Sequence, residues 1–162
     1  GGCAVAVLLG PGLGWYLGGV LVTGGMGLVV SFYMLDIDAK INSPEGAASL
    51  PCDVTGQVSC SRAARSKHSA VLFGLKNASL GCISYGLVVV CALARLLTGM
   101  YWPVLLIVAL SFCGVVASVY LLHLGLMVMR NVCPVCMAAH AVNLLLFGLA
   151  LGWSERIRWG EA

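Results

Sequence analysis

Apolar residues follow one another in four long stretches of the chain, and polar segments separate these stretches. Asp, Glu, Lys and Arg are all missing from residues 3–35, 77–94, 96–129 and 131–154. A helix that crosses a bilayer needs about 20 mainly apolar residues, so each stretch predicts one membrane-spanning helix. The chain is therefore expected to be one all-α domain over 1–162, a bundle of four transmembrane helices. We place these helices at about residues 12–37, 79–97, 100–129 and 134–153.

One long polar segment, residues 38–76, connects the first two predicted helices. The other two connections are the short turns Thr98-Gly99 and Arg130-Asn131. Four crossings put the 38–76 loop and the Arg130-Asn131 turn on the same side of the membrane. The cysteines of the loop and those that follow the last turn are therefore expected at one membrane face.

Composition indicates an apolar environment for the whole chain. Hydrophobic residues make up 60% of it and charged residues 9%, whereas a soluble domain has about 25% charged residues. The formal net charge is only +3, and the basic residues are scattered, which argues against a nucleic-acid partner. Membrane lipid is the predicted surrounding.

A Cys-Pro-Val-Cys motif carries the first candidate chemistry. Cys133 and Cys136 flank Pro134 where the last turn becomes a helix, and proline suits the first helical position. The N–H groups of the first turn and the helix dipole are expected to stabilise a Cys136 thiolate. A zinc site is the alternative, but it needs a second close pair, and Cys52 and Cys60 are spaced too widely for that pattern. A redox motif is favoured and no metal ligand is assigned.

Cys52 and Cys60 form a second candidate pair, in the 38–76 loop. A static disulfide that clamps this loop is one interpretation, as in non-enzymatic four-helix proteins of the claudin kind. The other is a relay, in which the loop pair exchanges with a soluble dithiol and the Cys133–Cys136 pair with a membrane substrate. The Cys-Pro-Val-Cys motif at the mouth of the last helix favours the relay. The remaining cysteines are interpreted as small, inert side chains: Cys3, Cys82, Cys91 and Cys113.

Polar side chains continue from Cys136 along one face of the last predicted helix. His140 is four residues further on and Asn143 seven, a spacing that keeps them on that face. Ionisable residues inside a span usually face an interior site, so His140 is a candidate to bind or protonate a quinone oxygen; a helix–helix hydrogen bond is equally compatible. Asn143 is assigned to helix packing. Asn77 and Tyr85 are further candidate donors at the start of the second helix.

The residues around both pairs resemble the vitamin K epoxide reductase family, in the form of its animal branch. The resemblance covers most of the chain and is carried by Cys52-Asp53-Val54, Ser59-Cys60-Ser61-Arg62, Asn77, Gly81-Cys82-Ile83, Ser118-Val119-Tyr120-Leu121 and Cys133-Pro134-Val135-Cys136. It implies a multi-pass enzyme of the endoplasmic reticulum membrane with the loop and the Cys133–Cys136 pair on the luminal side. Such an enzyme reduces vitamin K 2,3-epoxide to the quinone and the quinone to hydroquinone, which supports γ-glutamyl carboxylase. No tightly bound cofactor is implied, because dithiols supply the electrons.

The resemblance also implies a role for each cysteine. Cys136 would attack the substrate, Cys133 would resolve the adduct, and Cys60 would reduce the resulting disulfide. Cys52 would accept electrons from a luminal thioredoxin-like oxidoreductase. Asn77 matches the residue that binds a quinone carbonyl in the family. The other residues expected to bind the substrate are His140, Tyr85, Leu80 and Val135.

The chain departs from the family at the expected pocket. His140 stands where tyrosine is common, the tract from Phe73 to Asn77 is shorter than in the vertebrate enzyme, and Ala64 and Ser84 replace aromatic residues. These differences concern substrate preference and anticoagulant sensitivity rather than the relay. Because thiol–disulfide exchange is reversible, the same cysteines also suit a quinone-dependent disulfide-generating enzyme, which is the alternative function.

Basic residues point to the opposite orientation. The positive-inside rule would place the loop side in the cytoplasm, since it carries Lys40, Arg62, Arg65, Lys67, Lys76 and Arg130 against Arg95, Arg156 and Arg158 on the other side. We still expect a luminal loop, because disulfides persist in oxidising compartments.

Overall fold

The computed structural model describes residues 13–43, 52–53, 55, 58–66, 69–70 and 74–159. Cys3 and parts of the 38–76 loop lie outside the described residues. Four helices are long and apolar enough to cross a membrane, which confirms the predicted four-helix membrane fold. The helical elements are α2 (Leu13–Ile41), α3 (Cys60–Arg65), α4 (Asn77–Thr98), α5 (Trp102–His123), the π-helical η2 (Leu124–Val128) and α6 (Pro134–Arg158).

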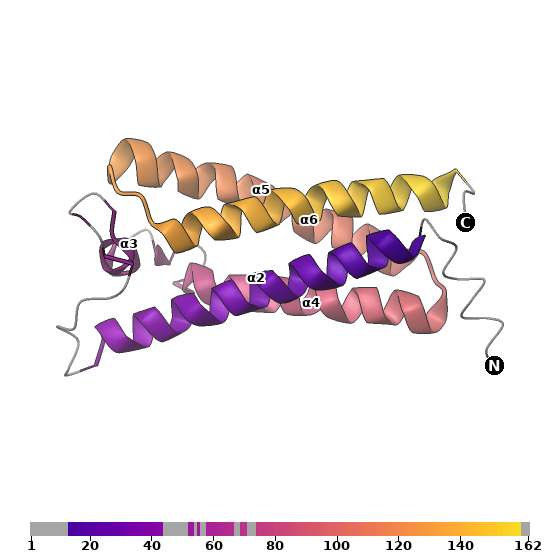
Figure 1. Ribbon diagram of the computed structural model, residues 1–162, viewed down its shortest axis with the longest axis horizontal. Coiled ribbons are helices and arrows are strands. Elements are labelled where there is room, and N and C mark those ends of the chain that lie inside the picture. Colours follow the sequence, from indigo (N-terminus) through magenta and orange to yellow (C-terminus); the bar gives the residue numbers. More distant parts are fainter. Residues whose placement is uncertain are drawn as a thin grey trace.

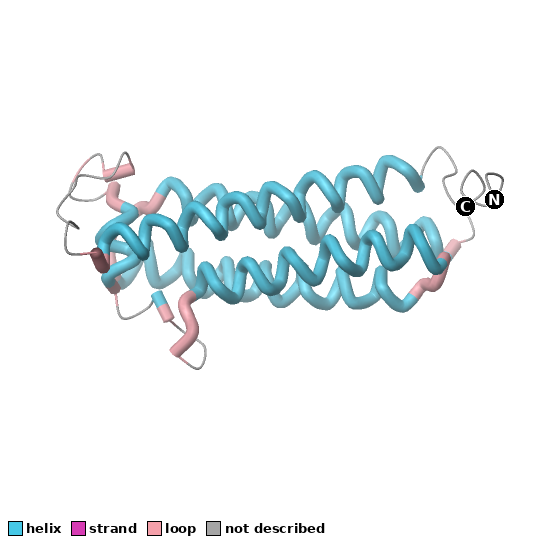
Figure 2. Tube along the Cα trace, turned by 90° about the horizontal axis from the view of Figure 1, so that it is seen from below, coloured by secondary structure: helices cyan, strands magenta, loops and turns pink. Residues whose placement is uncertain are grey.

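The four long helices lie side by side along the length of the molecule (Figure 1). α2 packs against α4 and α6, and α5 packs against the same two helices, so α2 and α5 occupy opposite corners of the bundle. α2 begins and α6 ends at one end of the bundle, and α3 lies at the other (Figure 1). The described turns and loops gather at the two ends (Figure 2). The middle of the molecule therefore consists of helices alone, as a membrane-spanning region requires.

The outer surface of the bundle carries many large apolar side chains. Exposed side chains on the four long helices include Val29, Leu87, Phe112 and Leu144. An apolar surface of this extent suits lipid rather than water. Tightly packed residues fill the space between the helices: Val20, Val88, Val104, Ile107, Leu146, Ala150 and Trp153.

α2 and α4 approach each other closely at Gly27. A Cβ atom added there would lie 2.4–2.5 Å from three ring carbons of Tyr85. Tyr85 is buried, and its hydroxyl donates a hydrogen bond to Asn143, so the ring has little room to move aside. Small residues commonly allow membrane helices to pack this closely.

Replacing Gly27 with alanine should therefore destabilise the bundle. We expect a loss of about 1–3 kcal/mol, the usual cost of overpacking a filled core, measured by thermal unfolding in detergent micelles. Gly25→Ala on the same helix is the control, because nothing lies within 4 Å of the added Cβ there. Equal losses in the two variants would show that the helices do not meet closely at Gly27.

The end of α2 lies further along the chain than predicted, at Ile41 instead of residue 37. Polar residues continue the helix because they have partners: Lys40 pairs with Asp36 one turn earlier, and Asp38 pairs with Lys76 at the start of α4. Asp38, which was assigned to the loop, is therefore a helical residue.

The starts of the other three long helices lie closer to their predicted positions than the end of α2 does. α4 begins at Asn77 and α5 at Trp102, each two residues from the predicted start, and α6 begins at Pro134 as predicted. α6 continues to Arg158, beyond the predicted end at residue 153, and the third predicted helix ends in the π-helical η2. Between α4 and α5, Gly99 adopts φ 68° and donates its N–H to the Arg95 carbonyl, a common way to end a helix.

Candidate active site

The short helix α3 holds the loop cysteines at one end of the bundle. Cys52 and Cys60 form a disulfide, and Cys60 is the first residue of α3. Ser59 caps this helix, since its Oγ accepts a hydrogen bond from the Arg62 N–H at 3.1 Å. A serine cap satisfies an N–H group that the first turn leaves unpaired, which fixes the backbone next to Cys60.

Asp53, the residue that follows Cys52, also stabilises the start of α3. Its Oδ1 accepts hydrogen bonds from Ser59 Oγ at 2.7 Å and from the Ser61 N–H at 3.1 Å. Burial acts to raise the pKa of Asp53, but the hydrogen bonds from Ser61 and Ser59 outweigh it and hold the pKa below its ordinary value. Asp53 is therefore ionised near neutral pH and acts as a fixed acceptor beside the loop pair.

Cys60 and Cys133 bring the two cysteine pairs into contact. Their Sγ atoms are 3.6 Å apart, and both side chains are buried. The backbones are also joined, because the Ser59 N–H donates to the Val132 carbonyl at 3.2 Å. The prediction that both pairs lie at the same face of the bundle is confirmed.

The N–H groups at the start of α6 stabilise Cys133 rather than Cys136. Cys133 is the N-cap, and its Sγ accepts a hydrogen bond from the Cys136 N–H at 3.3 Å. The Cys136 thiol donates to Cys133, and together with the N–H groups of Cys136 and Val135 it outweighs burial and lowers the pKa of Cys133. The expectation that the first turn would stabilise a Cys136 thiolate is thus wrong, because the first turn stabilises the thiolate of Cys133 instead. An N-cap side chain turns back onto the first turn, whereas Cys136 is itself part of that turn.

This arrangement predicts an alkylation profile for Cys133. Iodoacetamide reacts with the thiolate, so we expect the rate at Cys133 to rise with pH around a midpoint below the ordinary cysteine pKa of about 8.5. Cys136→Ala removes the main donor and should move the midpoint to higher pH, whereas Cys136→Ser keeps a donor and should move it less. Peptide mass spectrometry after timed alkylation across a pH series measures the midpoint. An unchanged midpoint in Cys136→Ala would refute the stabilising role of that thiol.

Two adjoining cavities lie beside Cys136. The first, of about 130 Å³, is at the loop end and is lined by both Cys133 and Cys136. The second, of about 380 Å³, extends toward the middle of the bundle. Cys136, Asn77 and His140 line both cavities. An apolar molecule in either cavity would therefore lie beside Cys136, Asn77 and His140.

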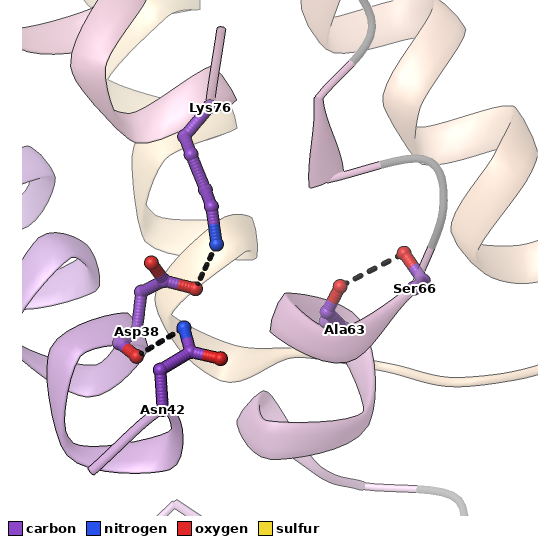
Figure 3. Close-up of polar contacts among 5 residues, drawn as sticks. All are labelled: Asp38, Asn42, Ala63, Ser66 and Lys76. Atoms are coloured by element: carbon purple, nitrogen blue, oxygen red, sulfur yellow. Dashed lines mark hydrogen bonds and ion pairs between the residues drawn. The ribbon is translucent and has the colours of Figure 1, made fainter. Parts of the chain in front are cut away.

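An ion pair forms part of the wall of the first cavity (Figure 3). Lys76 Nζ, at the start of α4, donates to Asp38 Oδ1 in the last turn of α2. Asn42 Nδ2 donates to the backbone carbonyl of Asp38 at 2.8 Å. Ser66 Oγ donates to the Ala63 carbonyl at 2.9 Å at the end of α3, and these two residues line the same cavity. The cavity thus has a polar rim at the loop end of the bundle.

The structure brings most of the predicted substrate-binding residues to these cavities. Asn77 and His140 line both, while Leu80 and Tyr85 line the second only. Val135 lines neither of the two cavities and packs beside the two cysteine pairs instead. The contact of Val135 with the substrate stays a prediction.

Tyr85 and Asn143 connect helices in the middle of the bundle. Tyr85 Oη donates to Asn143 Oδ1 at 2.7 Å, and Asn143 Nδ2 donates to Ser118 Oγ at 2.8 Å and to the Gly114 carbonyl at 3.2 Å. The assignment of Asn143 to helix packing is confirmed, since its amide joins α4, α5 and α6. The Tyr85 hydroxyl proton is already engaged by Asn143, so Tyr85 is not an open donor for a ligand.

Sequence reasoning did not identify Asp53 and Asn131 as residues of the site. In the sequence, Asn131 was only part of the short turn Arg130-Asn131. In the structure, Arg130 adopts φ 47° in this turn, and Asn131 Nδ2 donates to the Ser59 carbonyl at 2.8 Å. A serine just before a short helix could have indicated the Ser59 cap. Ala64 and Ser84 line the first and the second cavity respectively, so the differences noted at these positions lie at the site.

Comparison with known proteins agrees with this architecture. The family model described as "Vitamin K epoxide reductase family" matches residues 19–151. "Vitamin K epoxide reductase complex subunit 1" of Mus musculus is 31% identical over 140 residues, which cover 76% of this chain and 81% of the mouse protein. The family match includes both cysteine pairs and the residues that line the two cavities. The chain therefore belongs to the vitamin K epoxide reductase family of membrane oxidoreductases.

Proposed function

We propose that this protein reduces vitamin K 2,3-epoxide to the quinone and the quinone to the hydroquinone, in the membrane of the endoplasmic reticulum. The contact of 3.6 Å between the Sγ atoms of Cys60 and Cys133 carries this proposal. It connects a loop disulfide with a thiol pair that borders an apolar cavity. The family assignment and the name of the mouse relative support vitamin K as the substrate.

Cys136 is the proposed nucleophile, because it lines both cavities whereas Cys133 lines the first only. The thiolate form of Cys133, which its lowered pKa favours, takes the proton of the Cys136 thiol while Cys136 Sγ attacks a ring carbon of the substrate. Cys133 Sγ then attacks Cys136 Sγ, which releases the substrate with two more electrons and leaves a Cys133–Cys136 disulfide. Each reduction takes up two electrons and two protons; one proton comes from the Cys136 thiol and the other from water, so that epoxide yields quinone and water, and quinone yields hydroquinone.

Asn77 and His140 are the proposed contacts of the quinone oxygens. Both line the two cavities from different helices, α4 and α6, so they reach a ring placed beside Cys136 from two sides. A hydrogen bond to a carbonyl oxygen becomes stronger as negative charge develops on that oxygen during thiol attack. His140 also provides an N–H that an imidazole can pass on as a proton.

Electrons reach the Cys133–Cys136 pair through the loop in this proposal. Cys60 reduces the Cys133–Cys136 disulfide, Cys52 closes the loop disulfide, and a luminal thioredoxin-like oxidoreductase reduces the loop pair again. This places the loop and the Cys133 turn on the luminal side of the membrane. A γ-glutamyl carboxylase, which consumes hydroquinone, is the proposed functional partner.

Direct measurement of epoxide reduction tests the proposal. The purified protein in nanodiscs receives vitamin K epoxide and dithiothreitol, and chromatography quantifies the quinone and the hydroquinone formed. Cys82→Ala is the matched control, because Cys82 is outside both cysteine pairs and both cavities, and it should react like the parent. Turnover of quinone without any reduction of epoxide would reject the proposal in favour of a quinone-dependent disulfide-generating enzyme.

A further inference from the structure

Asn131 is a buried polar side chain that the catalytic cycle above leaves without a role. It is 3% exposed, and its Nδ2 donates to the Ser59 carbonyl at 2.8 Å. Its own N–H donates to the Gly125 carbonyl at 3.0 Å, which anchors it to η2. The side chain therefore joins the residue just before Cys60 to the turn just before Cys133.

Asn131 and Val132 together form a clamp that holds the backbone N–H and the backbone carbonyl of Ser59. The Ser59 N–H donates to the Val132 carbonyl at 3.2 Å, and the Ser59 carbonyl accepts from Asn131. Ser59 is thus bound to two successive residues of the turn, and Cys60 and Cys133 directly follow the two clamped segments. The clamp fixes the backbone on both sides of the contact between their Sγ atoms.

The energetics of Asn131 indicate a role beyond packing. Its Oδ1 is one of the buried polar atoms of the described residues that have no hydrogen-bond partner. Leaving such an acceptor unpaired destabilises the folded state, a cost that an apolar residue of similar size would avoid. The amide is therefore favoured at this position for its donor, Nδ2.

We propose that Asn131 is a positioning residue for electron transfer between the two cysteine pairs. This inference rests on the thiol relay of the proposed function, but it does not depend on which quinone is reduced. Cys60 thiolate attacks Cys133 Sγ of the Cys133–Cys136 disulfide; the Cys60–Cys133 bond forms, and Cys136 leaves as a thiolate that takes up a proton. Cys52 thiolate then attacks Cys60 Sγ and releases Cys133, so the loop pair is oxidised by two electrons and the Cys133–Cys136 pair is reduced. The attack needs the two sulfur atoms in line and near contact, and the Asn131 donor holds Cys60 there.

Disulfide trapping tests this role without any quinone. In a Cys52→Ala/Cys136→Ala parent, Cys60 and Cys133 are the remaining cysteines of the two pairs, and diamide should join them in one disulfide. We expect Asn131→Ala to slow this step by about tenfold to a hundredfold, in keeping with the effect of a misplacement of about 1 Å. Maleimide labelling of quenched samples and peptide mass spectrometry give the rate.

Asn42→Ala is the matched control. Asn42 also donates its Nδ2 to a backbone carbonyl at 2.8 Å, but at the exposed end of α2 and away from the clamp. We expect Asn42→Ala, introduced into the same parent, to form the Cys60–Cys133 disulfide at the parental rate. Equal slowing in Asn42→Ala and Asn131→Ala would overturn the specific role of the clamp.

Asn131→Asp separates positioning from general damage to the fold. A protonated carboxyl can donate to the Ser59 carbonyl, whereas an ionised one cannot. The trapping rate of Asn131→Asp, divided by that of the parent at the same pH, should therefore rise as the pH falls, while the ratio for Asn131→Ala should stay flat. Parental rates in both variants would overturn the inference and leave the relay standing; a parent that forms no Cys60–Cys133 disulfide would remove the relay as well.

Discussion

Replacement of Cys136 by alanine should abolish reduction of both vitamin K epoxide and quinone with dithiothreitol as the electron source. We expect turnover to fall by about 10³-fold or more, the scale of loss when a covalent nucleophile is removed. The reason is that Cys136 is the one member of the two cysteine pairs that lines both cavities. Product formation by the purified variant in nanodiscs gives the result.

A second cysteine makes this test specific. Cys113 lines the second cavity without belonging to either pair, so it is a possible substitute nucleophile. Cys113→Ala should keep most of the activity. If turnover survived in Cys136→Ala and disappeared in Cys113→Ala, the assignment of the nucleophile would be wrong.

Replacement of Cys60 by alanine should separate two electron sources. With reduced thioredoxin as the donor, we expect turnover to fall by about a hundredfold or more, because the intramolecular contact with Cys133 is lost. With dithiothreitol, which we expect to reduce the Cys133–Cys136 disulfide directly, most of the activity should remain. Initial rates of quinone formation with each reductant provide the comparison.

Cys52→Ala should behave like Cys60→Ala in this experiment, since both sulfur atoms belong to the same loop disulfide. Cys82→Ala is the control for a cysteine outside the pairs and should lose nothing with either reductant. The relay would be contradicted if Cys60→Ala lost the same fraction of activity with thioredoxin and with dithiothreitol.

The four-helix fold could be predicted because a long stretch without charged residues occurs four times in the sequence. Uncharged stretches long enough to span a bilayer leave few alternatives to a helix. Counting the crossings was then sufficient to place the loop and the start of α6 at the same end. The Cys-Pro-Val-Cys motif was located for a similar local reason, because Pro134 marks the first turn of a helix.

The missed helical segments have separate physical reasons. The last turn of α2 is stabilised by the ion pair between Asp38 and Lys76. These two residues are far apart in the sequence, so no local pattern predicts their pairing. α3 is too short for periodicity to indicate it, and it is held by Asp53 through Ser59.

The thiolate assignment failed for a geometric reason. The motif predicted that the first turn of the helix would stabilise a thiolate, and it does. The helix start at Pro134 was predicted correctly, and it makes Cys133 the N-cap. The N–H group of the first turn goes to the N-cap side chain, so the error was to assign it to Cys136, a residue inside that turn.

The burial of the sulfur atoms limits which of them a large partner protein can touch. Cys60 and Cys133 are shielded from solvent, while Cys52 is partly exposed. In the proposed relay, a large redox partner therefore exchanges with Cys52, and electrons then travel inward by exchange between neighbouring sulfur atoms. Proteins too large to enter the cavities are kept from Cys60 and Cys133, so reducing equivalents on these buried sulfur atoms are protected from protein oxidants that do not fit Cys52.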